Sequence, residues 1–90
     1  MKLIEILSIN LKYYRMQYNL SQEKFAEVLG TSLSYLNQIE NLIVNVRLAT
    51  VDKFASNINK FDHNSKISAT LLLTYNKEHI TNYSRVDEKK

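Results

Sequence analysis

The chain has 90 residues, of which 44 % are hydrophobic and 23 % are charged, and its formal net charge is +3. This length and composition fit one soluble globular domain and leave too little chain for a second. Because the chain contains no cysteine, disulfides, thiolate metal sites and thiol nucleophiles are excluded. No stretch predicts a signal peptide or a membrane span, so we expect a cytoplasmic protein whose mild positive charge permits binding to a polyanion.

The first helix is predicted between Lys2 and Tyr18. Its apolar residues are spaced by three and four positions, which places them on one helical face. Asn19 follows as a candidate C-cap, because asparagine tolerates the left-handed conformation in which many helices end. The apolar residues of this face are Leu3, Ile4, Leu7, Leu11, Tyr14 and Tyr18.

A second and a third helix are predicted directly after it. Ser21 is the predicted N-cap of the second helix, since its hydroxyl can accept from a backbone N–H group of the first turn. Gly30, the single glycine of the chain, ends this helix in a turn that requires a positive φ. Thr31 or Ser32 caps the third helix, which runs to about Asn41.

A fourth helix is predicted from about Leu48, with its apolar residues on one face as far as Ile58. The polar cluster at residues 62–65 ends it. The connection before this helix is unusually apolar at Leu42, Ile43 and Val44. We expect these three side chains to be buried under the C-terminal segment, and a partner site is the alternative.

The last third of the chain changes its period. Residues 67–75 alternate between apolar and polar and are rich in β-formers, so a strand is predicted there. Residues 76–79 are the predicted turn, and residues 80–86 are the predicted returning strand. Such a hairpin must pack on the helices or pair with another chain to be stable. A fifth helix is the alternative for this segment.

The stretch from Leu20 to Asn41 resembles the helix-turn-helix of the lambda-repressor-like (Cro/XRE) family. The matching elements are Leu-Ser-Gln-Glu at the entry, Phe-Ala in the first helix, Leu-Gly-Thr-Ser at the turn and Tyr-Leu-Asn-Gln-Ile-Glu-Asn in the second helix. The resemblance extends from Leu11 to about Ile58. It implies a mainly α fold, with a four-helix DNA-binding bundle at residues 1–60. The C-terminal extension at residues 61–90 lies outside the resemblance and is the predicted dimerisation element.

The third helix of the chain has two faces with different tasks. Leu36 and Ile39 hold it against the bundle, and the opposite face is free to enter a major groove. The resemblance implies that Gln38 bonds a base, and its amide suits an adenine edge. Leu33 suits contact with a thymine methyl group. A merely solvated polar face is the alternative. The candidate base-reading residues are Leu33, Ser34, Asn37 and Gln38.

Further residues are candidates for contact with the DNA backbone. The resemblance places Gln22 at a helix N-terminus where family members hold a phosphate, helped by backbone N–H groups. The complete set of candidate phosphate contacts is Gln22, Ser32, Tyr35, Asn41 and Arg47.

The resemblance also implies a structural clamp between Arg15 of the first helix and Glu40 of the third. The sequence departs from the family pattern in two places. The family commonly has a glycine and basic residues after Glu40-Asn41, where this chain has Leu42-Ile43-Val44. The recognition face also lacks arginine and lysine. We therefore expect few charged contacts with DNA and a shallow dependence of binding on salt.

Other classes of function find little support in the sequence. His63 and His79 are isolated in polar sequence and are predicted to be solvated, so no metal site or cofactor is expected. The single glycine excludes a glycine-rich phosphate loop. Because a chain this small forms a deep pocket with difficulty, an enzyme is not expected and no residue is predicted to be catalytic.

The leading hypothesis is therefore a sequence-specific transcriptional regulator that binds a palindromic double-stranded DNA operator as a homodimer. One recognition helix reads too few base pairs, and two half-sites restore specificity. A phage or mobile-element repressor and the controller protein of a restriction–modification system both fit this description. The alternative from another class is a protein-interaction module, such as an antitoxin that neutralises a partner protein.

Overall fold

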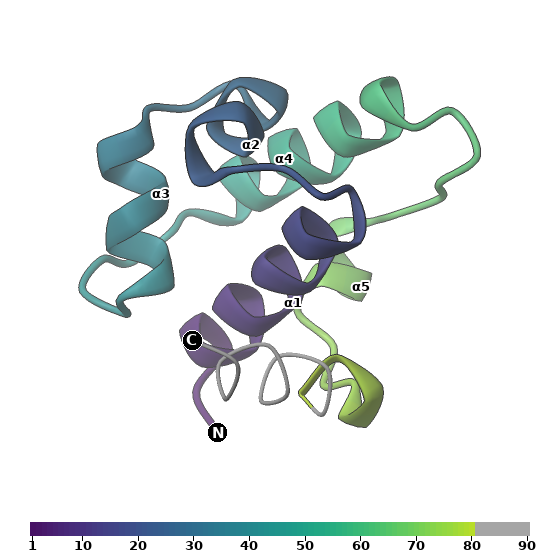
Figure 1. Cartoon of the computed structure of the whole chain (residues 1–90). Helices are drawn as coiled ribbons and strands as arrows, with labels where there is room; N and C mark the ends of the chain where they lie inside the picture. The colour runs from purple at the N-terminus through teal and green to yellow at the C-terminus, as the bar shows by residue number, and fades with distance from the viewer. Residues whose placement is uncertain (81–90) are drawn as a thin grey trace.

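The computed structural model describes residues 1–80, which fold into a small helical bundle (Figure 1). Within residues 1–80, none of the helices is long and apolar enough to cross a bilayer. The helices are α1 (Leu3–Gln17), α2 (Gln22–Leu29), α3 (Leu33–Glu40), α4 (Leu48–Phe61) and α5 (Ala69–Leu72). A further helical turn follows α5 at residues 77–80.

The predicted caps explain where α2 and α3 begin. The Ser21 hydroxyl accepts a hydrogen bond from the Lys24 N–H group at 3.1 Å. Ser32, rather than Thr31, caps α3 by accepting from the Tyr35 N–H group at 3.0 Å. These bonds satisfy donors that the first turn of a helix leaves without a backbone partner.

Three successive helices end in the same hydrogen-bonded motif, with one residue in the left-handed conformation. Asn19 follows α1 with φ 57°, Gly30 follows α2 with φ 76°, and Leu42 follows α3 with φ 65°. In each case backbone N–H groups turn back to carbonyls of the last helical turn. The positive φ predicted for Gly30 is confirmed, and so is the left-handed conformation of Asn19.

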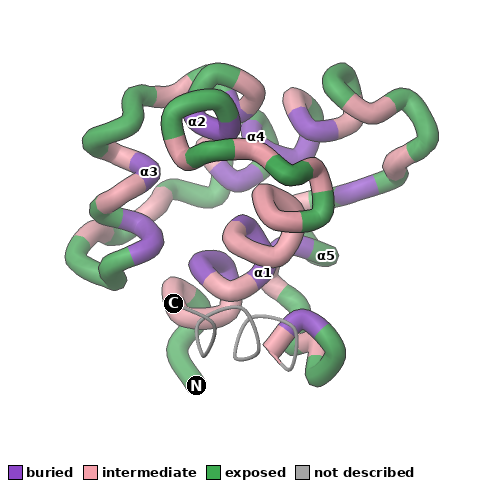
Figure 2. The backbone as a smooth tube through the Cα atoms, in the orientation of Figure 1, coloured by how far each residue is buried: buried purple, intermediate pink, exposed green. Residues whose placement is uncertain are grey.

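The core is formed where the apolar faces of the helices meet (Figure 2). α2 packs against both α3 and α4, and α1 packs against α3 and α5. Phe25 and Phe54 are the largest fully buried side chains. The other fully buried aliphatic residues are Leu7, Leu11, Leu29, Leu36, Ile39, Val51, Ile58 and Leu72.

The predicted C-terminal hairpin is wrong over the residues that the structure describes, which contain no strand. The alternative, a fifth helix, is confirmed as the short α5, which packs against α1 and α4. Ser68 caps it by accepting from the Leu71 N–H group at 3.1 Å. Burial also departs from the alternating pattern, since Leu72 is buried and Leu71 is exposed. Residues 81–86 of the predicted hairpin lie outside the described residues.

A side chain from α1 explains why this segment turns instead of extending. The Asn10 amide nitrogen donates to the carbonyl oxygens of Leu72 at 2.7 Å and Thr74 at 3.0 Å, and lies 3.5 Å from that of Leu71. The carbonyls of Leu71 and Leu72 end α5 and have no partner within the helix, and Thr74 lies just beyond it. The contact joins residues more than 60 positions apart, so the local sequence pattern does not contain it.

The prediction of a solvated His79 is also wrong. Its side chain is 7 % exposed and stacks on the Tyr13 ring, with 3.6 Å between ring centroids. Its Nδ1 atom lies 2.7 Å from Asn10 Oδ1. Because the Asn10 amide nitrogen already donates to carbonyls, Oδ1 is the acceptor and Nδ1 carries the proton. His63, in contrast, is exposed as predicted.

Candidate nucleic-acid interface

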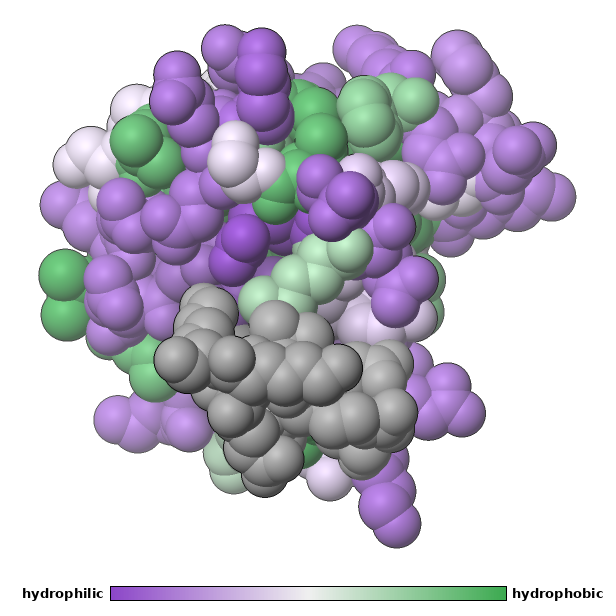
Figure 3. All heavy atoms as spheres, in the orientation of Figure 1, coloured by the Kyte–Doolittle hydropathy of each residue, from purple (hydrophilic) through white to green (hydrophobic). Residues whose placement is uncertain are grey.

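α3 turns one face to the core and another to solvent. Leu36, Ile39 and Glu40 are buried, and in Figure 2 the buried parts of α3 lie toward the rest of the bundle. Ser34 and Gln38 are exposed, and Leu33 is 41 % exposed. The side of the molecule on which α3 lies is mostly hydrophilic, with small separate apolar patches (Figure 3). The outward face of α3 is thus free for a ligand.

The predicted base-reading residues share this outward face only in part. Leu33, Ser34 and Gln38 are exposed, whereas Asn37 is half-buried. Leu33 is the first residue of α3, which places it beside Ser32 at the N-terminal end. Side chains at this end of a recognition helix are the ones that reach base edges in helix-turn-helix complexes.

The turn between α2 and α3 is held by two side chains of α4 that the sequence did not single out. The Lys53 ammonium donates to the Gly30 carbonyl oxygen at 2.7 Å. The Asn57 amide donates to the Leu29 carbonyl oxygen at 2.8 Å. Both side chains satisfy carbonyls at the C-terminus of α2. Their spacing of four residues puts them on one face of α4, but it does not say which backbone groups they reach.

The C-terminal end of α3 is held by an ion pair with α1. The Arg15 guanidinium donates to both carboxylate oxygens of Glu40, with Nε–Oε2 3.2 Å and Nη2–Oε1 3.3 Å. Side-chain exposure is 12 % for Arg15 and 2 % for Glu40. The Gln22 amide also donates to Glu40 Oε1, at 2.9 Å. One carboxylate therefore joins α1, α3 and the first residue of α2.

This arrangement bears on Gln22 as a phosphate contact. Its amide nitrogen is already engaged by Glu40, so it orients the carboxylate and the start of α2 in the free protein. The exposed residues among the predicted phosphate contacts are Ser32, Asn41 and Arg47, and Tyr35 is half-buried. Apart from Arg47 these side chains are uncharged, so the set offers one full positive charge for a phosphate.

The apolar connection after α3 is not covered as we expected. Ile43 is 72 % exposed and Leu42 is 46 % exposed, while Val44 is half-buried. Leu42 also has a positive φ at the position where the family commonly has glycine. A side chain with a Cβ atom costs about 1–2 kcal/mol in this conformation. The departure seen in the sequence is therefore a strained and exposed leucine in the structure.

The comparison with protein families decides what kind of protein this geometry belongs to. Residues 11–60 match the helix-turn-helix family model, over more than half of the chain. The chain belongs to the Cro/XRE family of helix-turn-helix DNA-binding proteins. It is 39 % identical over 59 residues to control protein C.SmaI of Serratia marcescens, covering 66 % of this chain and 70 % of that protein. No solved structure matches the chain significantly.

Membership of the Cro/XRE family makes the chain a DNA-binding transcriptional regulator. Its matched region begins in α1 and ends within α4, so it contains both partners of the Arg15–Glu40 pair and both of the α4 side chains that hold the turn. The C-terminal part with α5 and His79 lies beyond the match.

The described groups of this Cro/XRE protein whose pKa is shifted belong to parts that support the fold. Burial raises the pKa of the Tyr14 hydroxyl. Burial also lowers the pKa of His79, whose ring lies edge-on to the ring of Tyr14. Hydrogen bonds from Tyr18 and Ser65 lower the pKa of Asp62. Within residues 1–80, no cluster of three or more acidic or histidine side chains is placed to hold a metal ion.

Proposed function

We propose that this protein is a sequence-specific regulator that binds a palindromic double-stranded operator as a homodimer, in the cytoplasm. The observation that carries the proposal is the exposed outer face of α3, with Leu33, Ser34 and Gln38 unburied. That face stands on a helix fixed at both ends, by the Ser32 cap and by Glu40. A rigid helix with short and amide side chains suits readout in the major groove.

We infer the division of labour among these side chains from their chemistry. Gln38 bonds an adenine edge with both amide atoms, and Ser34 bonds a neighbouring base. Leu33 contacts a thymine methyl group. The half-buried Asn37 lies at the edge of the outward face of α3 and has a lesser part in reading the bases. Ser32, Tyr35, Asn41 and Arg47 fix the helix on the phosphates, with a lesser part for Gln22 because its amide is engaged. The proposed phosphate contacts are Gln22, Ser32, Tyr35, Asn41 and Arg47.

Among regulators of this family, the controller protein of a restriction–modification system is the role we favour. The similarity to control protein C.SmaI supports it. Discovery of the operator upstream of a methyltransferase or endonuclease gene would strengthen this role. An operator within a phage or mobile element would favour a repressor instead.

The test is selection of random duplex DNA by the purified full chain at near-physiological salt, followed by sequencing. We expect enrichment of a palindromic motif. The double variant Ser34→Ala/Gln38→Ala should lose that motif and keep its fold. The matched control is Gln17→Ala/Ser56→Ala, which removes the same two groups at exposed positions of α1 and α4. Absence of enrichment with the wild-type protein would contradict the proposal.

A further inference from the structure

The turn that precedes the recognition helix is bonded to α4 at two successive backbone carbonyls. The N–H groups of Gly30 and Thr31 turn back to carbonyls of the last turn of α2. The carbonyls of Leu29 and Gly30 accept instead from side chains of α4, Asn57 at 2.8 Å and Lys53 at 2.7 Å. α4 therefore holds the backbone of the turn itself, and not a side chain that could rotate away.

The same two side chains of α4 also lie close to the α-carbon of Gly30. An added Cβ atom on this glycine would lie 2.9 Å from the Asn57 amide nitrogen and 3.2 Å from Lys53 Cε. Phe54 and Ile58, which neighbour them on α4, are fully buried, so the backbone that carries both side chains is fixed in the core. Movement of the turn relative to α4 would break the two hydrogen bonds or shorten these contacts.

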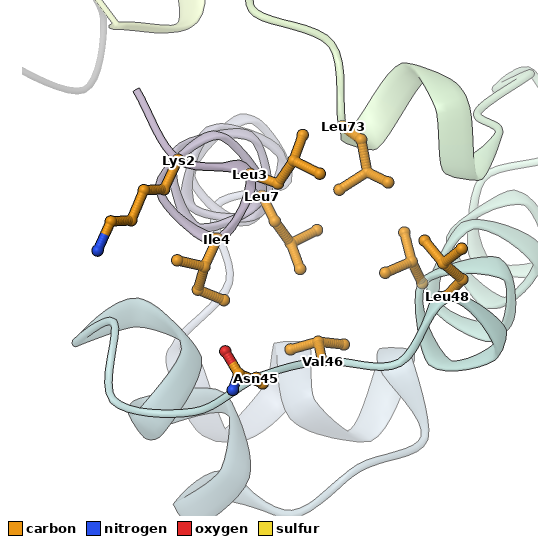
Figure 4. Close-up of a pocket in the computed structure, with 9 residues that line it drawn as sticks. Lys2, Leu3, Ile4, Leu7, Asn45, Val46, Leu48 and Leu73 are labelled. Carbon is orange, nitrogen blue, oxygen red and sulfur yellow. The ribbon is translucent and has the colours of Figure 1, made fainter.

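The chain itself fixes the start of α3 less well than this turn does. Along the chain, α4 is joined to the opposite end of α3, through the connection at residues 41–47. A hollow of about 290 Å³ lies between this connection and the start of α1 (Figure 4). Ile4 and Leu7 point into the hollow from α1, and Val46 points into it from the connection. Because this side of the connection is loosely packed, we attribute the position of the start of α3 to the bonds at the turn.

The two ends of α3 are thus fixed by different contacts. Only two residues separate Gly30 from Leu33, the first residue of α3. The other end is fixed by Glu40, through its ion pair with Arg15. The eight residues of α3 span about 12 Å, so a small shift of the turn tilts the helix about its Glu40 end.

We propose that Lys53 and Asn57 are positioning residues that determine how the start of α3 reads its base pairs. The inference rests on the proposed function, in which Leu33 and Ser34 read bases at this end of α3. A hydrogen bond to a base edge weakens steeply when its distance or angle leaves the optimum. A tilt about the far end displaces Ser34 more than Gln38. Loss of the α4 bonds therefore impairs the two ends of the reading face unequally.

A direct contact of Lys53 with a phosphate is the competing interpretation. The Lys53 ammonium is already bonded to the turn, and Asn57, which carries no charge, bonds the same turn beside it. A phosphate contact contributes about 0.9 to the salt slope of binding and acts on all sequences alike. A positioning role changes the preference among sequences instead, so the two interpretations predict different results.

The test uses the double variant Lys53→Met/Asn57→Leu, which removes both donors and keeps side chains of similar size. Fluorescence anisotropy measures affinity for the operator and for each of its single base-pair variants. The base pairs read by Ser34 and Gln38 are those at which Ser34→Ala and Gln38→Ala lose discrimination. In the α4 double variant, discrimination at the Ser34 base pair should fall from about tenfold to about threefold or less. At the Gln38 base pair it should change by less than about twofold.

Two further variants serve as controls for the base-pair profile. Lys53→Arg keeps a donor for the Gly30 carbonyl and should keep the wild-type profile. Lys60→Met/Asn64→Leu removes the same charge and the same amide at exposed positions near the end of α4 and just beyond it. This variant should also match the wild-type protein. Far-ultraviolet circular dichroism should show that every variant is folded at the temperature of the measurement.

Amide hydrogen exchange in the free protein tests the positioning without DNA. The Tyr35 N–H group is bonded to Ser32 at the start of α3, and the Asn41 N–H group is bonded to Asn37 at its end. In the α4 double variant, exchange at Tyr35 should accelerate about tenfold and exchange at Asn41 less than about twofold, as for a local opening. A general loss of stability would accelerate both amides equally.

Several results would overturn the positioning role. They are an unchanged base-pair profile, weaker binding to all duplexes with a smaller salt slope, and equal acceleration of exchange at the two ends of α3. A wild-type chain that prefers no duplex would contradict the proposed function and with it the effect on reading. Selective exchange at Tyr35 would even then support the positioning of α3 by α4.

Discussion

The ammonium group of Lys53 lies 2.7 Å from the carbonyl oxygen of Gly30, 23 residues earlier in the chain. It places a positive charge at the C-terminus of α2, where the helix dipole is negative. Through this bond and that of Asn57, α4 fixes the turn from which the recognition helix emerges. The position of the reading face is therefore set by a helix that lies outside the helix-turn-helix itself.

Replacement of Gly30 should weaken the fold at this turn. Gly30 has φ 76°, and an added Cβ atom would lie 2.9 Å from the Asn57 amide nitrogen. We expect Gly30→Ala to lower the free energy of unfolding by about 1–2 kcal/mol, the cost of a left-handed residue with a Cβ atom. Urea denaturation measures it. A loss below about 0.5 kcal/mol, the scatter of ordinary surface changes, would show that the turn adapts.

Removal of one partner of the Arg15–Glu40 pair should be more costly. Glu40 is nearly inaccessible, so Arg15→Met leaves its charge buried with only the Gln22 amide beside it. We expect a loss of about 3 kcal/mol in the free energy of unfolding. The exposed pair Lys24–Glu27 is the control, and Lys24→Met should cost at most about 1 kcal/mol. Equal effects of the two substitutions would argue against a clamp.

The proposed contact of Leu33 with a thymine methyl group can be tested on both molecules. Once the operator is known, deoxyuridine in place of the contacted thymine removes only the methyl group. Wild-type affinity should fall about fourfold, the equivalent of about 0.8 kcal/mol for one buried methyl group. Leu33→Ala should bind both duplexes equally. If the variant is as sensitive to deoxyuridine as the wild type, Leu33 does not contact that methyl group.

Binding to DNA should depend only weakly on salt. α3 contains no lysine or arginine, and Arg47 is the only charged residue among the proposed phosphate contacts. Each neutralised phosphate adds about 0.9 to the slope of log affinity against log salt. Arg47→Gln should therefore reduce the slope by about 0.9 per protomer and weaken binding to all sequences alike. A titration series read by fluorescence anisotropy measures both, and an unchanged slope would remove Arg47 from the interface.

His79 should make stability depend on pH in the mildly acidic range. Burial lowers its pKa, and the opposing effect of the nearby Glu78 carboxylate is smaller. Between the native pKa and the ordinary value of about 6.5, the unfolded chain takes up a proton that the native chain does not. The free energy of unfolding should thus be largest above this window and fall as the pH drops through it.

Urea denaturation at a series of pH values from about 7.5 to 5 measures this dependence, in the window where histidine titrates. His79→Gln should flatten the profile, and His63→Gln, at an exposed position, should leave it unchanged. Asp62, whose pKa is lowered by its hydrogen bonds, loses its contribution only at lower pH. A wild-type profile that is flat over this range would contradict the assignment to His79.

The first four helices were predictable from the sequence because their signals are local. Ser21 caps α2 by accepting from the N–H group of Lys24, three residues later. Gly30 turns the chain at a position whose positive φ glycine adopts easily. The spacing of Leu36 and Ile39 then indicates which face of α3 is buried. Each of these inferences uses neighbours within one or two helical turns.

The remaining features depend on contacts between distant parts of the chain. α5 turns because Asn10 bonds carbonyls at its end and just beyond it, and His79 is buried because it stacks on Tyr13. Neither contact changes the local sequence pattern. The alternation of residues 67–75 therefore predicted a strand, and the polar neighbours of His79 predicted a solvated side chain. The contacts of Lys53 and Asn57 with the end of α2 were not predictable for the same reason. The reading residues were inferred from resemblance to a family, and their contacts with DNA stay predictions.

The side chains that hold α3 are separate from those that face outward. This separation has a consequence for how the protein can evolve. Leu36, Ile39 and Glu40 fix the helix, whereas Ser34 and Gln38 are exposed and take no part in its anchoring. New side chains at the outward positions therefore meet little resistance from the fold. Under the proposed function, operator preference can drift, or be exchanged by design, while the scaffold that presents it stays the same.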